Sequence, residues 1–186
     1  MMLKRRGWIK ENSCGCSGKG REWRYTDLRS LCVQLLADSV LAHPIDNFGR
    51  FNRESRLIVL SSALALYDAG IVYGRDRKQD IGIVGTSTDG SLSSNLDYFR
   101  DYASCGRTLG RGNLFIYTLA SSPLAESSIH FGLQGPLVFL RYADDPEERM
   151  LAEAEFMIRN GDASALLAIV FDSQKADCHY LSGGMP

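Results

Sequence analysis

Residues 137–171 read LVFLRYADDPEERMLAEAEFMIRNGDASALLAIVF. The apolar run at 137–140 predicts a strand, and the longer apolar run at 165–171 predicts a strand that is covered on both faces. The segment between them, 146–160, predicts a helix, because a proline opens it and a glycine follows it. A strand, a helix and a second strand in this order favour parallel strands joined by a right-handed crossover.

The start of this helix is acidic. Asp144 or Asp145 is expected to cap it, because an aspartate side chain accepts hydrogen bonds from the free amides of a first turn. Glu147 and Glu148 follow at the positive end of the helix dipole, which favours negative charge. These residues therefore place the helix start between 144 and 146.

Strands and helices also alternate in the rest of the chain. Residues 51–70 predict a helix that is apolar almost all round, as in a buried helix, and residues 80–85 predict a short strand. The alternation favours an α/β fold with a mixed, mostly parallel sheet and helices on both faces. Residues 1–26 show little periodicity and are expected to form an edge strand and a loop, while residues 27–186 form one domain.

Composition sets further limits. The chain has 186 residues, which suits one domain, and a formal net charge of -1, which gives no electrostatic footprint for nucleic acid. No apolar run reaches the roughly 20 residues of a membrane span, and the basic start lacks the apolar stretch of a secretory signal. The five cysteines are odd in number and irregularly spaced, which favours reduced thiols and a cytoplasmic location.

Several short motifs follow one another along the chain. They are FNRESR at 51–56 with ALYDAG at 65–70, IVGTS at 83–87, FGLQGP at 131–136 and IRNGDA at 158–163. In this order and spacing they resemble the N-terminal half of the beta-ketoacyl synthases, members of the thiolase-like superfamily. The resemblance covers residues 31–172 and implies a fold like one half of a thiolase-like subunit.

The sequence departs from this family at the nucleophile. The family carries a cysteine shortly after the Gly-Pro, where a helix N-terminus lowers the thiol pKa and the thiolate takes the acyl group. On the family's spacing, Asp144 occupies the position of that cysteine, and none of the five cysteines lies near it. We expect that a helix cap has replaced the nucleophile, so that no catalytic residue is present. A different carboxylate chemistry at Asp144 is the alternative.

The length of the chain can be compared with that of the family's enzymes. The family's other catalytic groups, two histidines or a histidine and an asparagine, lie in a second thiolase-like half, and 186 residues are about half of a condensing enzyme. His43, His130 and His179 do not match those motifs. His130 is expected to be a packed, hydrogen-bonded histidine, with a general base as the alternative. The chain is therefore not expected to condense acyl groups alone; if it is active, the resemblance implies an acyltransferase of beta-ketoacyl synthase type.

The resemblance implies a dimer. In the family, the strand after the Gly-Pro lies at the dimer interface, and the corresponding residues here are Leu137, Val138, Phe139 and Leu140. A homodimer, or a heterodimer with a ketosynthase, is therefore expected.

An acyl carrier protein is a second expected partner. Arg50, Arg53 and Arg56 recur at three-residue spacing at a helix start, so they can share a face that meets an acidic carrier protein. A second basic cluster at 75–78 offers the same charge, and a plainly solvated basic face is the alternative to both.

Three functions stay open at this point. The first is a non-catalytic ketosynthase-like protein of fatty-acid, polyketide or aryl-polyene type biosynthesis, acting with a ketosynthase or an acyl carrier protein. The family's chain-length factors offer a parallel, since they lack the cysteine but keep both halves. The second is an acyltransferase completed by a partner chain, and the third is an acyl-binding or small-ligand module. No cofactor and no metal is expected: Cys14-Gly15-Cys16 lacks the second ligand pair of a zinc site and is expected to be a reduced loop.

Overall fold

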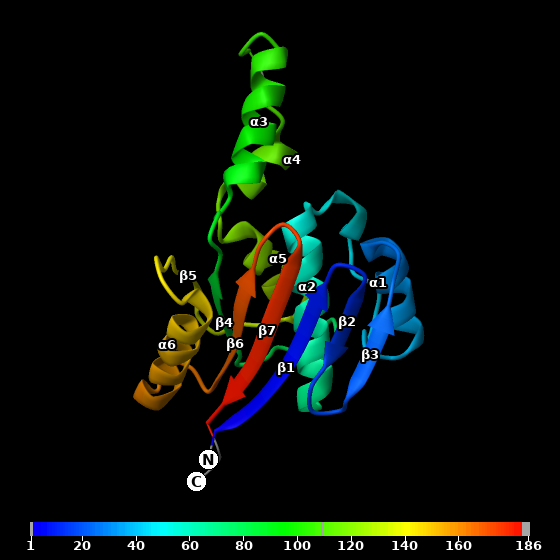
Figure 1. Ribbon diagram of the computed structural model, residues 1–186, viewed down its shortest axis with the longest axis vertical. Helices are drawn as coiled ribbons and strands as arrows, with labels where there is room; N and C mark the ends of the chain where they lie inside the picture. The colour runs from blue at the N-terminus through cyan, green and yellow to red at the C-terminus, as the bar shows by residue number, and fades with distance from the viewer. Residues whose placement is uncertain (1, 109, 184–186) are drawn as a thin grey trace.

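The chain folds around one seven-stranded sheet (Figure 1). The computed structural model describes residues 2–108 and 110–183. The strands lie in the order β3-β2-β1-β7-β6-β4-β5. Their bounds are Leu3–Lys10 (β1), Ser13–Cys16 (β2), Arg21–Arg24 (β3), Gly82–Thr86 (β4), Leu137–Phe139 (β5), Ala165–Phe171 (β6) and Lys175–Ser182 (β7).

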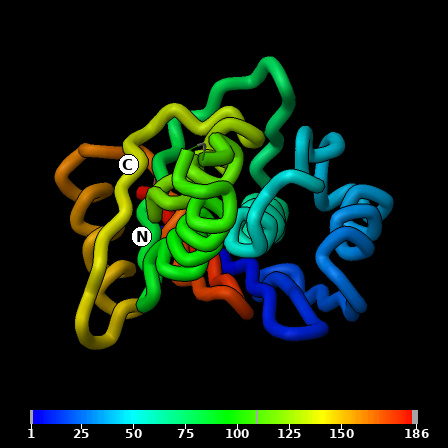
Figure 2. Tube along the Cα trace, turned by 90° about the horizontal axis from the view of Figure 1, so that it is seen from above, coloured from blue at the N-terminus to red at the C-terminus, as the bar shows by residue number. Residues whose placement is uncertain are grey.

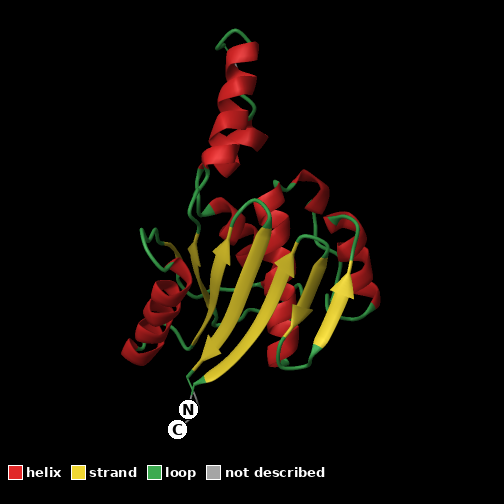
Figure 3. Cartoon of the chain, viewed as in Figure 1, coloured by secondary structure: helices red, strands yellow, loops and turns green. Residues whose placement is uncertain are grey.

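Helices cover both faces of the sheet, as the sequence predicts (Figure 3). Their bounds are Leu28–Ala37 (α1), Arg53–Ala69 (α2), Leu92–Ser104 (α3), Gly112–Phe115 (α4), Ser122–Phe131 (α5) and Pro146–Asn160 (α6), with short 3-10 turns at Phe48–Arg50 (η1) and Ile116–Thr118 (η2). Successive residues of β6 alternate between the two faces. Leu167 and Ile169 join the core under α2 and α5, whereas Leu166 and Ala168 join the smaller core under α6. No helix within residues 2–108 and 110–183 has the length and apolar character to cross a membrane.

The sheet is mixed, but its parallel part is smaller than expected. β4 pairs in parallel with β5 on one side and with β6 on the other, whereas the four remaining pairings are antiparallel. The chain passes from β5 through α6 to β6, which confirms the strand–helix–strand unit predicted for residues 137–171. The extra antiparallel pairings arise because β7 turns back beside β6 and pairs along its whole length with β1.

The described part of residues 1–26 forms three strands instead of one edge strand and a loop. β1 lies inside the sheet between β2 and β7, and only β3 lies at the edge. Cys14 and Cys16 belong to strand β2 and are buried in the core, so the expected loop at these cysteines is wrong. Burial raises the pKa of Cys14 to about 12, which keeps its thiol protonated and unreactive.

Helix α2 is the centre of the main core, as its apolar sequence predicts. Twelve of its 17 residues are buried, and it packs on β1, β7 and α5. Asn52 caps it, because the side chain of Asn52 accepts a hydrogen bond of 2.9 Å from the amide of Ser55. Gly70 ends it in the left-handed conformation, with a φ of 71°.

Helices α3 and α4 form an arm that projects from the end of the sheet where β4 finishes (Figure 1). Figure 2 looks down on this arm, with α1 and α6 on opposite sides of it. No residue of α3 is buried. The arm and the segment 116–119 that follows it expose large apolar side chains, namely Leu92, Leu96, Phe99, Phe115, Ile116 and Leu119. An exposed apolar surface of this kind is typical of a protein interaction site.

Candidate functional site

Asp144 lies in the loop between β5 and α6, where its side chain is exposed. The capping position belongs to Asp145, whose backbone is left-handed with a φ of 46° and whose side chain makes no capping hydrogen bond. A capping side chain requires an extended backbone to reach the first-turn amides. The expected capping by Asp144 or Asp145 is therefore wrong.

The surroundings of Asp144 hold no group that would activate it. Within residues 2–108 and 110–183, its carboxylate makes no side-chain hydrogen bond and no ion pair. Nucleophilic side chains work beside an oriented base or in a site that shifts their pKa. The loop before α6 therefore offers an exposed carboxylate and no assembled nucleophilic site.

A polar network with a buried histidine lies one turn further along, at the start of α6. The Nε2 atom of His179 lies 3.3 Å from a Glu147 oxygen and 3.4 Å from an Asp177 oxygen. The guanidinium of Arg6 binds both oxygens of Asp177, with its Nε atom 2.7 Å from Oδ1. The side chain of His179 is 8% exposed, and burial lowers its pKa although both carboxylates oppose the change.

This network ties the start of α6 to strands β1 and β7. A metal ion needs at least three His, Cys, Asp or Glu side chains whose ligand atoms lie close together. In the described residues, one such group exists, and it consists of Glu147, Asp177 and His179. A cation there would face the guanidinium of Arg6, which already neutralises Asp177. We therefore interpret the network as a structural ion pair.

The structure separates the three arginines proposed for a carrier protein. Arg50 lies in the η1 turn, whereas Arg53 and Arg56 lie in the first turn of α2. Arg53 and Arg56 line a pocket of about 390 Å³ together with Arg29 of α1, which the sequence analysis missed. Two of the three expected arginines, Arg53 and Arg56, therefore lie together, with Arg29 beside them. Arg50 does not line this pocket.

These arginines keep their charge available. Arg29, Arg50, Arg53 and Arg56 make no ion pair with any described acidic residue. Backbone carbonyls hold two of them: Arg56 donates to Phe48 and Gly49, and Arg53 donates to Ser173. Burial, followed by the nearby charges of Arg29 and Arg53, lowers the pKa of Arg56. Such a cluster of cations favours an anionic partner.

Strand β5 forms a free edge of the sheet. The Ile83 amide donates to the Pro136 carbonyl at 2.7 Å, and the Leu140 amide donates to the Gly85 carbonyl at 2.9 Å. Because alternate residues of a parallel strand bond to one neighbour, the peptide groups of Leu137 and Phe139 point away from β4. The unpaired groups of β5 can therefore accept another strand.

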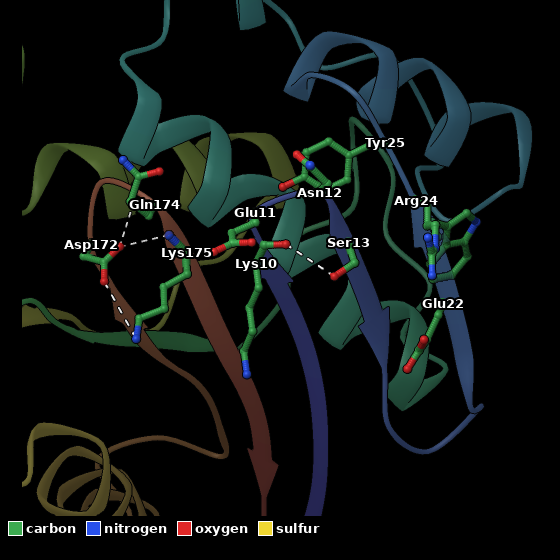
Figure 4. Close-up of a pocket in the computed structure, with 11 residues that line it drawn as sticks. Lys10, Glu11, Asn12, Ser13, Glu22, Arg24, Tyr25, Asp172, Gln174 and Lys175 are labelled. Carbon is green, nitrogen blue, oxygen red and sulfur yellow. Dashed lines mark hydrogen bonds and ion pairs between the residues drawn. The ribbon is translucent and has the colours of Figure 1, made fainter.

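A surface depression of about 960 Å³ lies between the β1–β2 turn, β3 and the β6–β7 turn (Figure 4). Its charges are mixed, and Asp172 accepts hydrogen bonds from the backbone amides of Gln174 and Lys175 and pairs with the Lys175 ammonium. No histidine or cysteine lines it. This depression therefore assembles no catalytic set.

A smaller pocket of about 260 Å³ contains His43 and His130, with Asp46, Arg75 and Glu126 among its lining residues. The two imidazole rings lie 4.6 Å apart between centroids, in an edge-to-face arrangement. Burial and the neighbouring His43 lower the pKa of His130 to about 4; Asp46 opposes this change and Arg75 adds to it. His130 is thus neutral at pH 7, and its ring packs on Tyr73 and Phe131, which confirms the expected packing. Within residues 2–108 and 110–183 its buried Nε2 atom has no hydrogen-bond partner, so the expected hydrogen bond is not found there.

Comparison with known proteins places the fold. No protein-family model and no curated protein matches the sequence. The ishigamide ketosynthase/chain length factor is similar in structure, with a TM-score of 0.67 at 11% identity over 98% of this chain and 62% of that one. The ketosynthase ApeO in complex with its chain length factor ApeC, from Xenorhabdus doucetiae, is also similar. Its TM-score is 0.53 at 20% identity, over 78% of this chain and 63% of that one.

A third similar structure includes a carrier protein. It is the AntDE:AntF complex, a type II PKS acyl-carrier protein with its ketosynthase, with a TM-score of 0.56 at 10% identity over 71% of this chain and 44% of that one. This chain thus spans less than two thirds of the length of each of these structures. The likenesses confirm the predicted fold: the chain folds like a part of these ketosynthase and chain length factor structures.

The depressed pKa of His130 predicts a pH dependence of stability. An unfolded histidine titrates near pH 6.5, whereas His130 in the folded protein titrates at about 4. Below pH 6.5 the unfolded chain therefore binds a proton that the folded chain does not, so the free energy of unfolding falls between about pH 6.5 and about pH 4. His130→Asn should remove this part of the pH dependence, as measured by urea unfolding of both proteins across that range. Parallel pH profiles for the wild type and the variant would contradict the assignment.

Proposed function

We propose that the protein is a non-catalytic, ketosynthase-like subunit that acts with a ketosynthase or an acyl carrier protein in the cytoplasm. The pathway would be fatty-acid, polyketide or aryl-polyene type biosynthesis. The observation that supports the proposal is a ketosynthase-type fold with an exposed Asp144 in the loop before α6. On the family's spacing, this residue corresponds to the family's cysteine. A carboxylate would form an anhydride with an acyl group, not the thioester that the family's reaction uses.

The absence of an acyl-enzyme intermediate is the direct test. After incubation with acyl thioesters, the intact mass of the protein should not change. Cys105 is an exposed free thiol, so Cys105→Ser is used throughout to prevent unspecific acylation. A covalent adduct that forms in this protein and disappears when Asp144→Ala is added would instead favour the acyltransferase alternative.

A partner chain is the second part of the proposal. Strand β5 has free peptide groups at Leu137 and Phe139, and its four half-buried apolar residues continue to Leu140. The arm formed by α3 and α4 adds exposed apolar side chains beyond the end of β4. A second sheet edge that pairs with β5 would satisfy the free groups and cover the apolar surface.

A substitution at Phe139 tests this edge. Phe139→Pro removes the outward amide and the ring, whereas Phe139→Ala removes only the ring, which packs against Phe171. Because the two variants lose the same side-chain contact, Phe139→Pro should weaken association by about tenfold or more relative to Phe139→Ala. Analytical ultracentrifugation, with a ketosynthase present or absent, measures this difference. Equal association of the two variants would show that β5 pairs with no partner strand.

Carrier-protein binding is the third part. Arg53 and Arg56 present unpaired positive charge beside Arg29, and an acidic carrier protein complements that charge. The edge at strand β5 and the arginine pocket involve different residues. One molecule can therefore bind a partner chain at the edge and a carrier protein at the pocket.

Charge reversal separates this surface from the second basic cluster. Arg53→Glu with Arg56→Glu should weaken binding of an acyl carrier protein by about tenfold or more, and mostly through slower association. The matched control is Arg77→Glu with Lys78→Glu, which reverses two exposed charges elsewhere. Surface plasmon resonance at two salt concentrations gives both rates. A loss of binding only in the control pair would move the contact to residues 75–78.

A further inference from the structure

The pocket of about 390 Å³ at the start of α2 collects three positive charges in one place. Arg29, Arg53 and Arg56 line it, and within residues 2–108 and 110–183 none of them forms an ion pair. Burial, and then the positive charges of Arg29 and Arg53, lower the pKa of Arg56, so the three guanidiniums are near enough to repel one another. An anion in the pocket would relieve this repulsion.

Backbone carbonyls hold two of the guanidiniums in position. Arg53 donates through its Nε atom to the carbonyl of Ser173. Arg56 donates through its Nε atom to Phe48 at 3.2 Å and through one terminal nitrogen to Gly49 at 3.0 Å. In the part of the chain that the structure describes, these contacts leave both terminal nitrogens of Arg53 and one of Arg56 free to donate. A guanidinium that is already anchored loses less conformational freedom when it binds a ligand.

Two helices also begin at this pocket. Arg29 lies in the first turn of α1, whereas Arg53 and Arg56 lie in the first turn of α2. The positive end of a helix dipole favours a nearby anion. The amides of α1 are already occupied, because the Asp27 carboxylate accepts from the amides of Arg29 at 2.8 Å and Ser30 at 3.0 Å. A ligand would therefore bind to the guanidiniums, and the two dipoles would add to their attraction.

We propose that Arg29, Arg53 and Arg56 bind the terminal phosphate group of a small phosphorylated molecule. A phosphomonoester offers three acceptor oxygens and a charge of about −1.5 to −2 at pH 7, which matches three guanidiniums. A carboxylate or a phosphodiester offers two such oxygens and one charge. The planar guanidinium also fits phosphate oxygens with two parallel hydrogen bonds.

The pocket has room for more than the phosphate group. Its volume lies in the range of about 300–1,000 Å³ that is usual for small-molecule sites. The half-buried Tyr25 also lines it; burial raises the pKa of Tyr25, and Arg53 is near enough to oppose this shift. Tyr25 is therefore placed to contact the organic part of the ligand. Glu11 lines the pocket as an exposed carboxylate that, within the described residues, pairs with none of the three arginines.

This site goes beyond the proposed function, because a phosphorylated ligand requires neither a ketosynthase nor a carrier protein. The ligand and a carrier protein would compete for Arg53 and Arg56. Arg29→Gln tests the phosphate site, whereas the contact with a carrier protein is tested by charge reversal at Arg53 and Arg56. The two proposals can therefore fail separately.

Titration with inorganic phosphate and with methyl phosphate, at constant ionic strength, tests the site. The Nε–Hε signals of Arg53 and Arg56 in proton–nitrogen NMR spectra should shift and saturate, with a dissociation constant on the order of 1 mM or below. Arg29→Gln should weaken binding of both ligands by about tenfold, because it removes one charge-assisted pair. The matched control is Arg50→Gln, which removes an exposed arginine outside the pocket and should leave the affinity unchanged.

Three results would overturn the proposal. The first is the absence of a saturable shift up to about 20 mM phosphate. The second is an equal loss of affinity in Arg29→Gln and Arg50→Gln, which would mean that a diffuse positive surface attracts the anion. The third is binding of acetate or dimethyl phosphate as tight as that of methyl phosphate, which would mean that any single negative charge suffices. Wild-type titrations decide the first and third results even if a variant does not fold.

Discussion

The close approach of helix α2 to strand β1 is the contact on which the rest of the structure depends. A Cβ atom at Gly7 would lie 2.4 Å from the amide nitrogen of Ala65 and 2.5 Å from the carbonyl oxygen of Ser61. Only glycine lets a helix backbone lie this near to a strand. The contact holds β1 in the middle of the sheet, where it pairs with β2 and β7.

The C-terminal end of α2 fixes the neighbouring strands through hydrogen bonds to one carboxylate. Asp68 is buried, and its carboxylate accepts hydrogen bonds from the backbone amides of Gly18 at 2.8 Å, Lys19 at 2.7 Å and Arg6 at 3.3 Å. The turn between β2 and β3 is therefore held by a side chain of the helix. The aspartate of the ALYDAG motif thus has a structural role that connects the N-terminal strands to the core.

The fold could be predicted where the sequence carries a regular pattern. α2, α6 and β6 are apolar over many residues or have proline and glycine at their ends, so local sequence suffices to place them. β1 and β7 could not be placed this way. Only Gly7 and Ile9 of β1 are buried, and the partner of β1 lies at the other end of the chain. For the site, spacing located Asp144 and two of the arginines, whereas the pairing of His43 with His130 arises from tertiary packing alone.

The two faces of the sheet also differ in a way that bears on partners. On β1, residues alternate, so Lys4, Arg6, Trp8 and Lys10 point away from α2. Trp8 lies over Gly15, Lys10 lies over the Trp8 ring, and Arg6 is paired with Asp177. A layer of apolar helices packed on this face would bury these charges at a high desolvation cost. In contrast, β5 and the arm expose apolar side chains and free peptide groups, so a partner chain gains more by binding at that edge than on the charged face.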